Sequence, residues 1–285
     1  MKEAIQVEDG KYGRRATIRS RWSEEMAGLL LAKDVVELEL NDGKGWIGKD
    51  VSFLSELPQL LSFKIIDLRI QSVAPVHVLR ALLTLEVITY CQTEIMFSAF
   101  PQLDDCAIEW RPGAASLFGC STLRHLFVNR YDGVDVDQFA KLNNLESLAI
   151  LNAPIRDLRG LRGLTRLKCL RLANLRQLTS LAGVEALANL EELEITACDA
   201  IGSIQEVAFL KQLRRLQLNN DGDIASLKPL EVLSGLESVL FYESTNILDG
   251  NLQPLTFQKN LSRVSFRNRR HYSHRREDFG MAYSR

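Results

Sequence analysis

One short apolar pattern recurs along the chain and limits what the chain can fold into. Eleven copies of apolar-x-x-apolar-x-apolar occur, and successive copies begin 25, 25, 18, 20, 22, 22, 23, 23, 23 and 25 residues apart. The copies begin at Val35, Leu60, Leu85, Leu103, Leu123, Leu145, Leu167, Leu190, Leu213, Leu236 and Leu261. A period of this length predicts stacked structural units that share one continuous core.

Each repeat is expected to contain one strand and one short helical segment. Apolar residues at positions 4 and 6 alternate with variable residues at positions 3, 5 and 7, which is typical of a half-buried strand. A second apolar set follows at a spacing of three, as in Ile155, Leu158, Leu161 and Leu164. That spacing favours 3₁₀ turns or short α-helices behind the sheet. No proline falls at positions 3 to 7 of any copy, as a hydrogen-bonded strand requires.

These residues carry a family resemblance. The stretch LESLAILNAPIRDLRGLRGLTR, residues 145–166, resembles the 22-residue repeat of the internalin and phosphatase-regulator class of leucine-rich repeat proteins. The resemblance covers about residues 35–268 and implies an α/β fold, a right-handed solenoid or horseshoe of about 11 repeats. One parallel sheet would line its concave face, and 3₁₀ or short helices its convex face. The family also implies partner binding through the concave sheet, although fold alone does not give function.

The chain departs from the family pattern at the turn after each strand. The usual asparagine at position 9 is mostly replaced, for example by Ala153, Leu175, Cys198 and Asp221. Polar residues occur one place earlier, at Asp42, Asp67, Gln92, Asn152, Asn174, Asn220 and Asn268. We therefore expect a less uniform turn than a regular asparagine ladder would give.

An open stack needs protected ends, and the sequence suggests three parts. Residues 1–34 are expected to form an N-terminal cap, with a hairpin turning near Asp9-Gly10 and a short helix beginning at Ser23. Residues 35–268 would form the solenoid. Residues 269–285 would form a C-terminal cap and a basic tail.

The bulk properties argue against several functional classes. The net charge is −1, from 35 basic and 36 acidic residues, so no global field attracts nucleic acid or anionic lipid. The N-terminal residues lack an apolar signal core, and no apolar run approaches the roughly 18 residues of a membrane span. The five cysteines are scattered, and Cys106 and Cys198 fall on core positions. We expect reduced thiols, a cytoplasmic location and no membrane partner.

A glycine-rich segment imitates a dinucleotide-binding motif. Gly43, Gly45 and Gly48 form G-x-G-x-x-G directly after an apolar strand, and Asp67 ends the next strand. However, the strand beginning at Val35 is in register with ten later copies, and the residues after Gly48 suit a tightly packed helix poorly. The segment is predicted to be a turn, and no cofactor is expected.

The C-terminal region offers the only strongly basic segment. It contains Arg263, Arg267, Arg269, Arg270, His271, His274, Arg275 and Arg276. One interpretation is a nucleic-acid or phosphate site, and the other is a solvated cap edge softened by Glu277 and Asp278. Sparse aromatic residues favour the second. No metal-ligand set, catalytic constellation or small-molecule site is recognisable, so the chain is predicted not to be an enzyme.

The variable strand positions are where a partner would bind. Phe127 and His125 are expected beside the small residues Ser147 and Ala149, which together resemble an interaction hot spot. Arg171, Glu192, Glu194 and Arg215 alternate in sign on adjacent strands, either as self-paired charges or as groups that set partner register. The full predicted surface consists of His125, Phe127, Asn129, Leu151, Arg171, Glu192, Glu194, Arg215, Gln217, Leu240 and Tyr242.

The sequence therefore favours a non-enzymatic module for protein–protein interaction, which recognises a protein partner of unspecified identity. Nucleic-acid or phosphate binding through the basic C-terminal end is the alternative. A regulatory or anti-toxin role toward an effector is a variant of the main interpretation, and no residue points to it.

Overall fold

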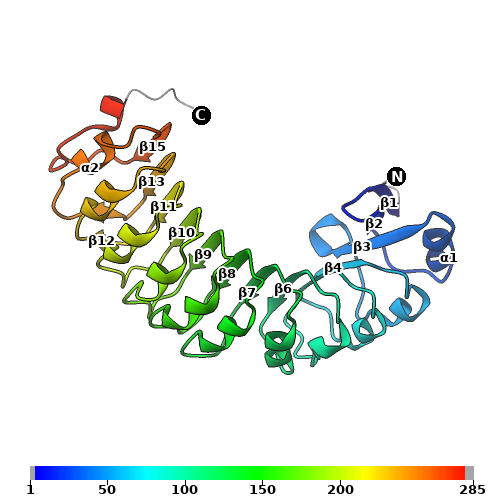
Figure 1. Cartoon of the computed structure of the whole chain (residues 1–285). Helices are drawn as coiled ribbons and strands as arrows, with labels where there is room; N and C mark the ends of the chain where they lie inside the picture. Colours follow the sequence, from blue (N-terminus) through cyan, green and yellow to red (C-terminus); the bar gives the residue numbers. More distant parts are fainter. Residues whose placement is uncertain (1–3, 280–285) are drawn as a thin grey trace. The chain divides into compact units, whose positions relative to one another are not determined.

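The computed structural model describes residues 4–279 of the chain. The chain divides between Val128 and Asn129 into two compact units. In each unit short helices line one face of the sheet and leave the other face open (Figure 1). Strand order follows chain order throughout each unit, as expected for stacked repeats.

The first unit begins with an antiparallel hairpin. Its strands are β1 (Ile5–Asp9) and β2 (Arg14–Ile18), and α1 (Glu25–Ala32) follows them. The strands of the repeats are then β3 (Val35–Asn41), β4 (Ser62–Ile66), β5 (Thr84–Ile88), β6 (Asp105–Glu109) and β7 (His125–Asn129). The 3₁₀ helices are η1 (Asp42–Lys44), η2 (Ser52–Glu56), η3 (Ala74–Val78), η4 (Phe97–Ala99) and η5 (Ala114–Gly119). The hairpin turn closes through Gly10 N–H donating to the Gly13 carbonyl at 2.7 Å.

The second unit contains six strands of the same kind. They are β8 (Ser147–Leu151), β9 (Cys169–Ala173), β10 (Glu192–Thr196), β11 (Arg215–Asn219), β13 (Ser238–Tyr242) and β15 (Arg263–Phe266). A two-stranded ladder of β12 (Asp223–Ile224) and β14 (Asn246–Ile247) runs beside them. The helices are η6 (Asp137–Lys141), η7 (Arg159–Gly163), η8 (Val184–Ala186), η9 (Gln205–Phe209), η10 (Lys228–Val232), α2 (Gln253–Thr256) and η11 (Arg276–Phe279).

The strands of the second unit pair in parallel and one-to-one. Leu170 of β9 lies opposite Leu148 of β8 and Leu193 of β10, so position 4 of each repeat meets position 4 of the next. Leu170 and Leu172 are fully buried, and so are the helix-side residues Leu161 and Leu164. The predicted period-two strand and the three-residue apolar spacing are both confirmed.

One repeat starts at a different residue from the one predicted. Leu85 of β5 pairs with Phe63 of β4, and Val87 with Ile65, so this repeat begins at the buried Leu82 rather than at Leu85. The error arose because the stretch LLTLEVITY fits the apolar pattern in two frames. With the correct frame the spacing before and after this repeat becomes 22 (60 to 82) and 21 (82 to 103), and Glu86 occupies position 5.

The turn after each strand is more regular in the second unit than predicted. Position 8 adopts a left-handed backbone in six consecutive repeats, at Arg130, Asn152, Asn174, Ala197, Asn220 and Glu243. The backbone N–H of Asn174 donates to the Thr196 carbonyl of the next repeat at 2.9 Å, and Ala197 donates likewise to Asn219 at 2.8 Å. Asparagine tolerates this conformation better than most residues, which explains its place one position early. The expected irregularity is therefore wrong for this unit.

The first unit does have a different turn. With the corrected frame, Asp67 and Thr89 stand at position 8, and both are buried. Neither is among the described residues with a left-handed backbone. The residues that follow them, Leu68 and Tyr90, are 44% and 51% exposed. In these two repeats position 8 is thus buried and position 9 is exposed. In the second unit position 9 is the buried one, as at Leu175.

A carboxyl group fills position 9 in one repeat of the second unit. Asp221 is fully buried, and its Oδ1 accepts the backbone N–H of Cys198 at 2.9 Å. Its Oδ2 is buried and has no hydrogen-bond partner within residues 4–279. Burial raises the pKa of Asp221 to about 7, and the hydrogen bond from Cys198 opposes this shift. The turn therefore contains a carboxyl group that is neutral in mild acid.

The first prediction concerns the pH dependence of stability. In the unfolded chain Asp221 releases its proton near pH 3.8, whereas in the folded chain its pKa is about 7. Between these two pH values the folded chain binds more protons, so the free energy of unfolding falls as the pH rises. Asp221→Asn removes this titration. Urea unfolding measures the free energy of unfolding at about pH 5 and about pH 8. The decrease between these two pH values should be smaller in the variant than in the parent, by at least about 1 kcal/mol. The control, Asp132→Asn at an exposed carboxylate, should keep the parent's pH dependence. Equal pH dependence in Asp221→Asn and the parent would contradict the assignment.

The second prediction concerns the left-handed turn. Asn174 is exposed and has a φ of 56°, so its side chain contributes little packing. Asn174→Val should reduce the free energy of unfolding by about 1–2 kcal/mol because a β-branched residue is strained there, whereas Asn174→Gly should change it by less than about 1 kcal/mol. Urea denaturation measures both. Comparable losses for valine at Asn174 and at exposed Arg176, which is not left-handed, would refute this explanation.

Candidate partner-binding surface

The open sheet face of the second unit presents five strands in continuous register. Position 5 forms one column across this face, in which each residue pairs with the next: Ala149, Arg171, Glu194, Gln217 and Leu240. Positions 3 and 7 form parallel columns on either side, because alternate residues of a strand point to the same face. Of the eleven predicted surface residues, those on β8 to β13 are thus brought onto one face of one unit.

The alternating charges on this face pair with one another. Arg171 Nε lies 3.3 Å from Glu194 Oε2 across the β9–β10 pair, and Arg215 forms an ion pair with Glu192 across β10–β11. The arginine side chains are 60% and 51% exposed, so water screens both pairs. Self-pairing, the interpretation that the sequence slightly favoured, is the arrangement found.

Solved structures with the same repeat architecture include two internalins. An internalin (inlF) from Listeria monocytogenes matches with a TM-score of 0.66 and 22% identity, covering 86% of this chain and 71% of that one. Internalin C2 from the same organism matches with a TM-score of 0.53 and 22% identity over 64% and 80% of the two chains. The fold is that of a leucine-rich repeat solenoid.

A plant receptor shares this solenoid fold. The Arabidopsis receptor kinase HAESA, solved in complex with the peptide hormone IDA and the co-receptor SERK1, matches with a TM-score of 0.61 and 19% identity. The match covers 83% of this chain and 46% of that one. No protein-family model and no curated protein matches the sequence.

Position 7 of the solenoid holds polar groups with unused hydrogen-bonding capacity. Thr196 and Asn219 lie opposite each other on β10 and β11, and Tyr242 continues the column on β13. Thr196 Oγ1 and Asn219 Oδ1 are buried atoms for which residues 4–279 offer no hydrogen-bond partner. Further along, Asn152 Nδ2 donates to Asn129 Oδ1 at 2.7 Å. Asn129 and Tyr242 of this column are among the residues predicted from the sequence, whereas Thr196 is not.

One predicted surface residue differs from expectation, and two others stay predictions. Leu240 is only 8% exposed, so it offers a partner little surface, although it lies in register with Gln217 and Ser265 on the neighbouring strands. Phe127 and His125 are half-buried on β7. Their predicted proximity to Ser147 and Ala149 joins two separately described units and stays a prediction.

The corresponding face of the first unit is partly occupied by the chain's own hairpin. The Tyr12 hydroxyl lies 3.0 Å from Thr84 Oγ1 on β5, and Lys11 Nζ lies 3.7 Å from Asp104 just before β6. Arg15 forms a 2.9 Å ion pair with Glu37, which is only 2% exposed. The hairpin thus lies along position 3 of these repeats. The sequence pattern did not predict this contact, since Tyr12 and Thr84 alone are 72 residues apart.

The glycine-rich segment is a turn, as predicted. Asn41 Oδ1 accepts the Gly43 N–H at 2.9 Å at the start of η1, and Gly45 adopts a φ of 107° at its end. No helix follows Gly48 directly, because residues 49–51 are irregular. The geometry of a dinucleotide fingerprint, a strand leading through the glycines into a helix, is not formed.

The basic C-terminal segment is partly used for internal contacts. An Arg269 amino group donates to the carbonyls of Glu243, Ser244 and Thr245 at 3.4, 3.3 and 3.2 Å. His271 Nε2 lies 3.0 Å from the Ile247 carbonyl. The predicted tail residues 280–285 lie outside the described residues.

Three observations bear on other functional classes. Within residues 4–279, no group of three or more His, Cys, Asp or Glu side chains could hold a metal ion. The described helices are all too short or too polar to cross a membrane. All five cysteines are free thiols, and Cys106 and Cys198 are buried as predicted.

The third prediction tests the surface charge pairs. A double-mutant cycle of Arg215→Ala and Glu192→Ala should give a coupling free energy below about 1 kcal/mol, because both side chains are exposed enough for water and salt to screen them. Urea unfolding at low and high salt measures this coupling. A coupling above about 2 kcal/mol that survives high salt would show that the pair is a structural element rather than a surface contact.

Proposed function

We propose that this protein is a non-enzymatic interaction module whose second unit recognises a protein partner through the open face of its sheet. The proposal extends to a cytoplasmic setting, in keeping with five unpaired thiols. Its contact residues would be those at positions 3, 5 and 7 of β8 to β13 other than the buried Ser238 and Leu240, with Phe127 and His125 on β7 as further candidates.

The observation that carries this proposal is the composition of the position 7 column. Buried polar atoms without a partner cost roughly 1–3 kcal/mol each, and a ligand or water that supplies the missing hydrogen bond removes that cost. Thr196 and Asn219 have such atoms side by side, next to the half-buried phenol ring of Tyr242. An aromatic residue beside unsatisfied polar groups is the composition expected at the centre of a protein interface.

The charge pairs support recognition of a protein in a different way. Because Arg171 and Arg215 already have acidic partners on the same face, they add little to stability. Exposed charges of alternating sign do set the register and the association rate of a complementary partner. HAESA offers an analogy, since its solved structure contains a peptide hormone and a co-receptor.

Nucleic-acid or phosphate binding through the C-terminal arginines is less well supported. Arg269 and His271 are engaged with backbone carbonyls, and the chain as a whole carries a net charge of −1. A regulatory or anti-toxin role would use the same open face and differs only in the identity of the partner.

The fourth prediction tests the proposed face. Phe127→Ala and Tyr242→Ala should each weaken binding of a captured protein partner by more than about 1 kcal/mol without unfolding the solenoid. Isothermal titration calorimetry measures the affinity, and circular dichroism verifies the fold.

Matched control variants are available on the helix side of the second unit. Phe209 and Phe257 are 63% and 54% exposed, so Phe209→Ala and Phe257→Ala remove aromatic rings of the same kind from the other face. These controls should bind as the parent does. If instead they lose affinity while Phe127→Ala and Tyr242→Ala do not, the partner binds the helix side.

A further inference from the structure

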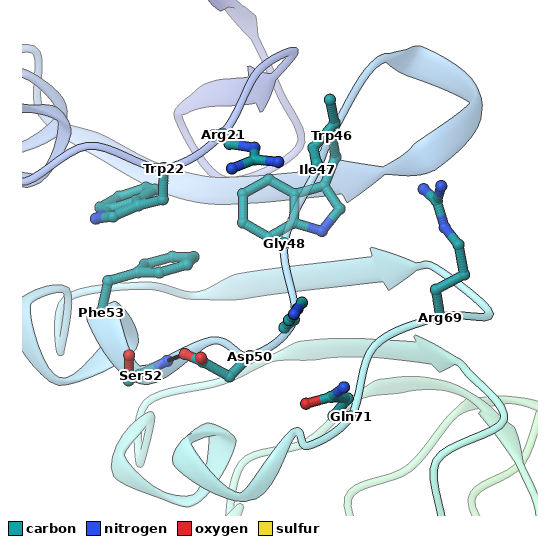
Figure 2. Close-up of a pocket in the computed structure, with 11 residues that line it drawn as sticks. Arg21, Trp22, Trp46, Ile47, Gly48, Asp50, Ser52, Phe53, Arg69 and Gln71 are labelled. Carbon is teal, nitrogen blue, oxygen red and sulfur yellow. Dashed lines mark hydrogen bonds between the residues drawn. The ribbon is translucent and has the colours of Figure 1, made fainter.

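A cavity with a mixed aromatic and charged lining lies in the first unit. It has a volume of about 530 Å³, within the range of about 300–1,000 Å³ that is typical of small-molecule sites. Its walls come from the loops that follow β2, β3 and β4, joined by the parallel bridge between Arg21 and Ile47 and by Gln71 N–H donating to the Lys49 carbonyl at 2.8 Å. Figure 2 shows these loops surrounding the cavity.

Three aromatic rings form one wall. Trp22 and Phe53 stack with their centroids 3.6 Å apart, and Trp46 meets Phe53 edge-on at 6.0 Å. A side chain on Gly48 would collide with the Trp46 ring, so glycine is what allows the loop backbone to lie against the indole. Stacking covers one face of Trp22 and one face of Phe53, and the wall that these rings form with Trp46 is apolar.

The charged groups of the cavity are mostly cationic. Arg21, Lys49 and Arg69 line it together with one carboxylate, Asp50. Asp50 Oδ1 accepts the Ser52 N–H at 2.9 Å, a bond drawn as the dashed line in Figure 2. Arg69 lies 3.4 Å from Asp67, but the side chains of Arg21 and Lys49 have no acidic partner among the described residues. Two uncompensated cations thus line one small cavity.

A buried donor in the wall also lacks an acceptor. Trp46 is 1% exposed, and its indole N–H has no hydrogen-bond partner within residues 4–279. Leaving such a group unpaired costs roughly 1–3 kcal/mol, and an oxygen acceptor in the cavity would remove that cost. In Figure 2 the indole lies between the Arg21 side chain and the Gly48 backbone, with Arg69 and Gln71 across the cavity.

We propose that this cavity binds a ligand that carries an oxyanion, either a carboxylate or a phosphate, on a small apolar body. Arg21 and Lys49 would neutralise the charge, and the Trp46 N–H would donate to one oxygen. The apolar body would lie against Trp22, Phe53 and Ile47, and Ile47 is 50% exposed. The site lies in the first unit and is independent of the protein-binding face proposed for the second.

The fifth prediction uses the indole N–H resonances of the full-length chain. The sequence has three tryptophans, and two of them line this cavity, so Trp110 serves as an internal control. Phenylacetate and phenyl phosphate, titrated into ¹⁵N-labelled protein, should shift the Trp46 N–H signal saturably, whereas Trp110 stays unchanged. Neutral phenylacetamide should shift Trp46 at least about tenfold less at equal concentration, because it lacks the charge that Arg21 and Lys49 recognise. The relative affinity of the two anions distinguishes a carboxylate from a phosphate ligand.

Two double variants complete the test. Arg21→Gln with Lys49→Gln removes the two unpaired cations and should abolish the saturable shift. Arg166→Gln with Lys33→Gln changes the total charge equally at exposed residues outside the cavity and should leave the shift intact. Thermal unfolding verifies that both variants fold. The proposal is overturned if neither anion shifts Trp46, if phenylacetamide shifts it equally, or if the shift survives loss of Arg21 and Lys49.

Discussion

Burial of each repeat's apolar side chains by its neighbours is the interaction on which the structure depends. A strand that exposes Leu170 and Leu172 on one side cannot cover them by itself, and the equivalent leucines of adjacent strands complete the core. One-to-one parallel register follows, because a shift of one residue would turn these side chains to the opposite face. Positions 3, 5 and 7 are thereby released from core packing, so their chemistry can serve recognition.

The turn after the strand links consecutive repeats through the backbone. In the second unit a left-handed residue at position 8 directs its N–H to a carbonyl of the next repeat, as Asn174 does toward Thr196. This bond does not require a particular side chain, and Ala197 makes it with only a small one. Position 9 is then free to be apolar, as at Leu175, or to hold the carboxyl of Asp221. The family's asparagine ladder is therefore not needed to order these turns.

Periodicity predicted the repeats, their strands and their helix-side core because those features depend on local spacing. It failed where one stretch fits the pattern in two frames, as at Leu85, and only strand pairing with Phe63 resolved the choice. Exposure of a column residue was also not predictable from alternation, since Leu240 stands at position 5 and yet is only 8% exposed. Contacts between distant segments, such as Tyr12 with Thr84, leave no periodic signal.

The two units differ in what their open faces can contact. In the first, the hairpin occupies position 3 of the repeats, and Lys44 and Lys64 form ion pairs with Glu39 and Glu86 at 2.8 and 2.9 Å. The cations without an acidic partner lie in the loops beyond the strands, at Arg21 and Lys49. In the second, no hairpin contact is found on the described strands, and two of its unsatisfied side-chain atoms, on Thr196 and Asn219, lie on the sheet itself. The two proposed binding surfaces therefore differ in kind, a loop cavity in the first unit and a sheet face in the second. The two proposed surfaces share no residue, so variants of one can be tested without changing a residue of the other.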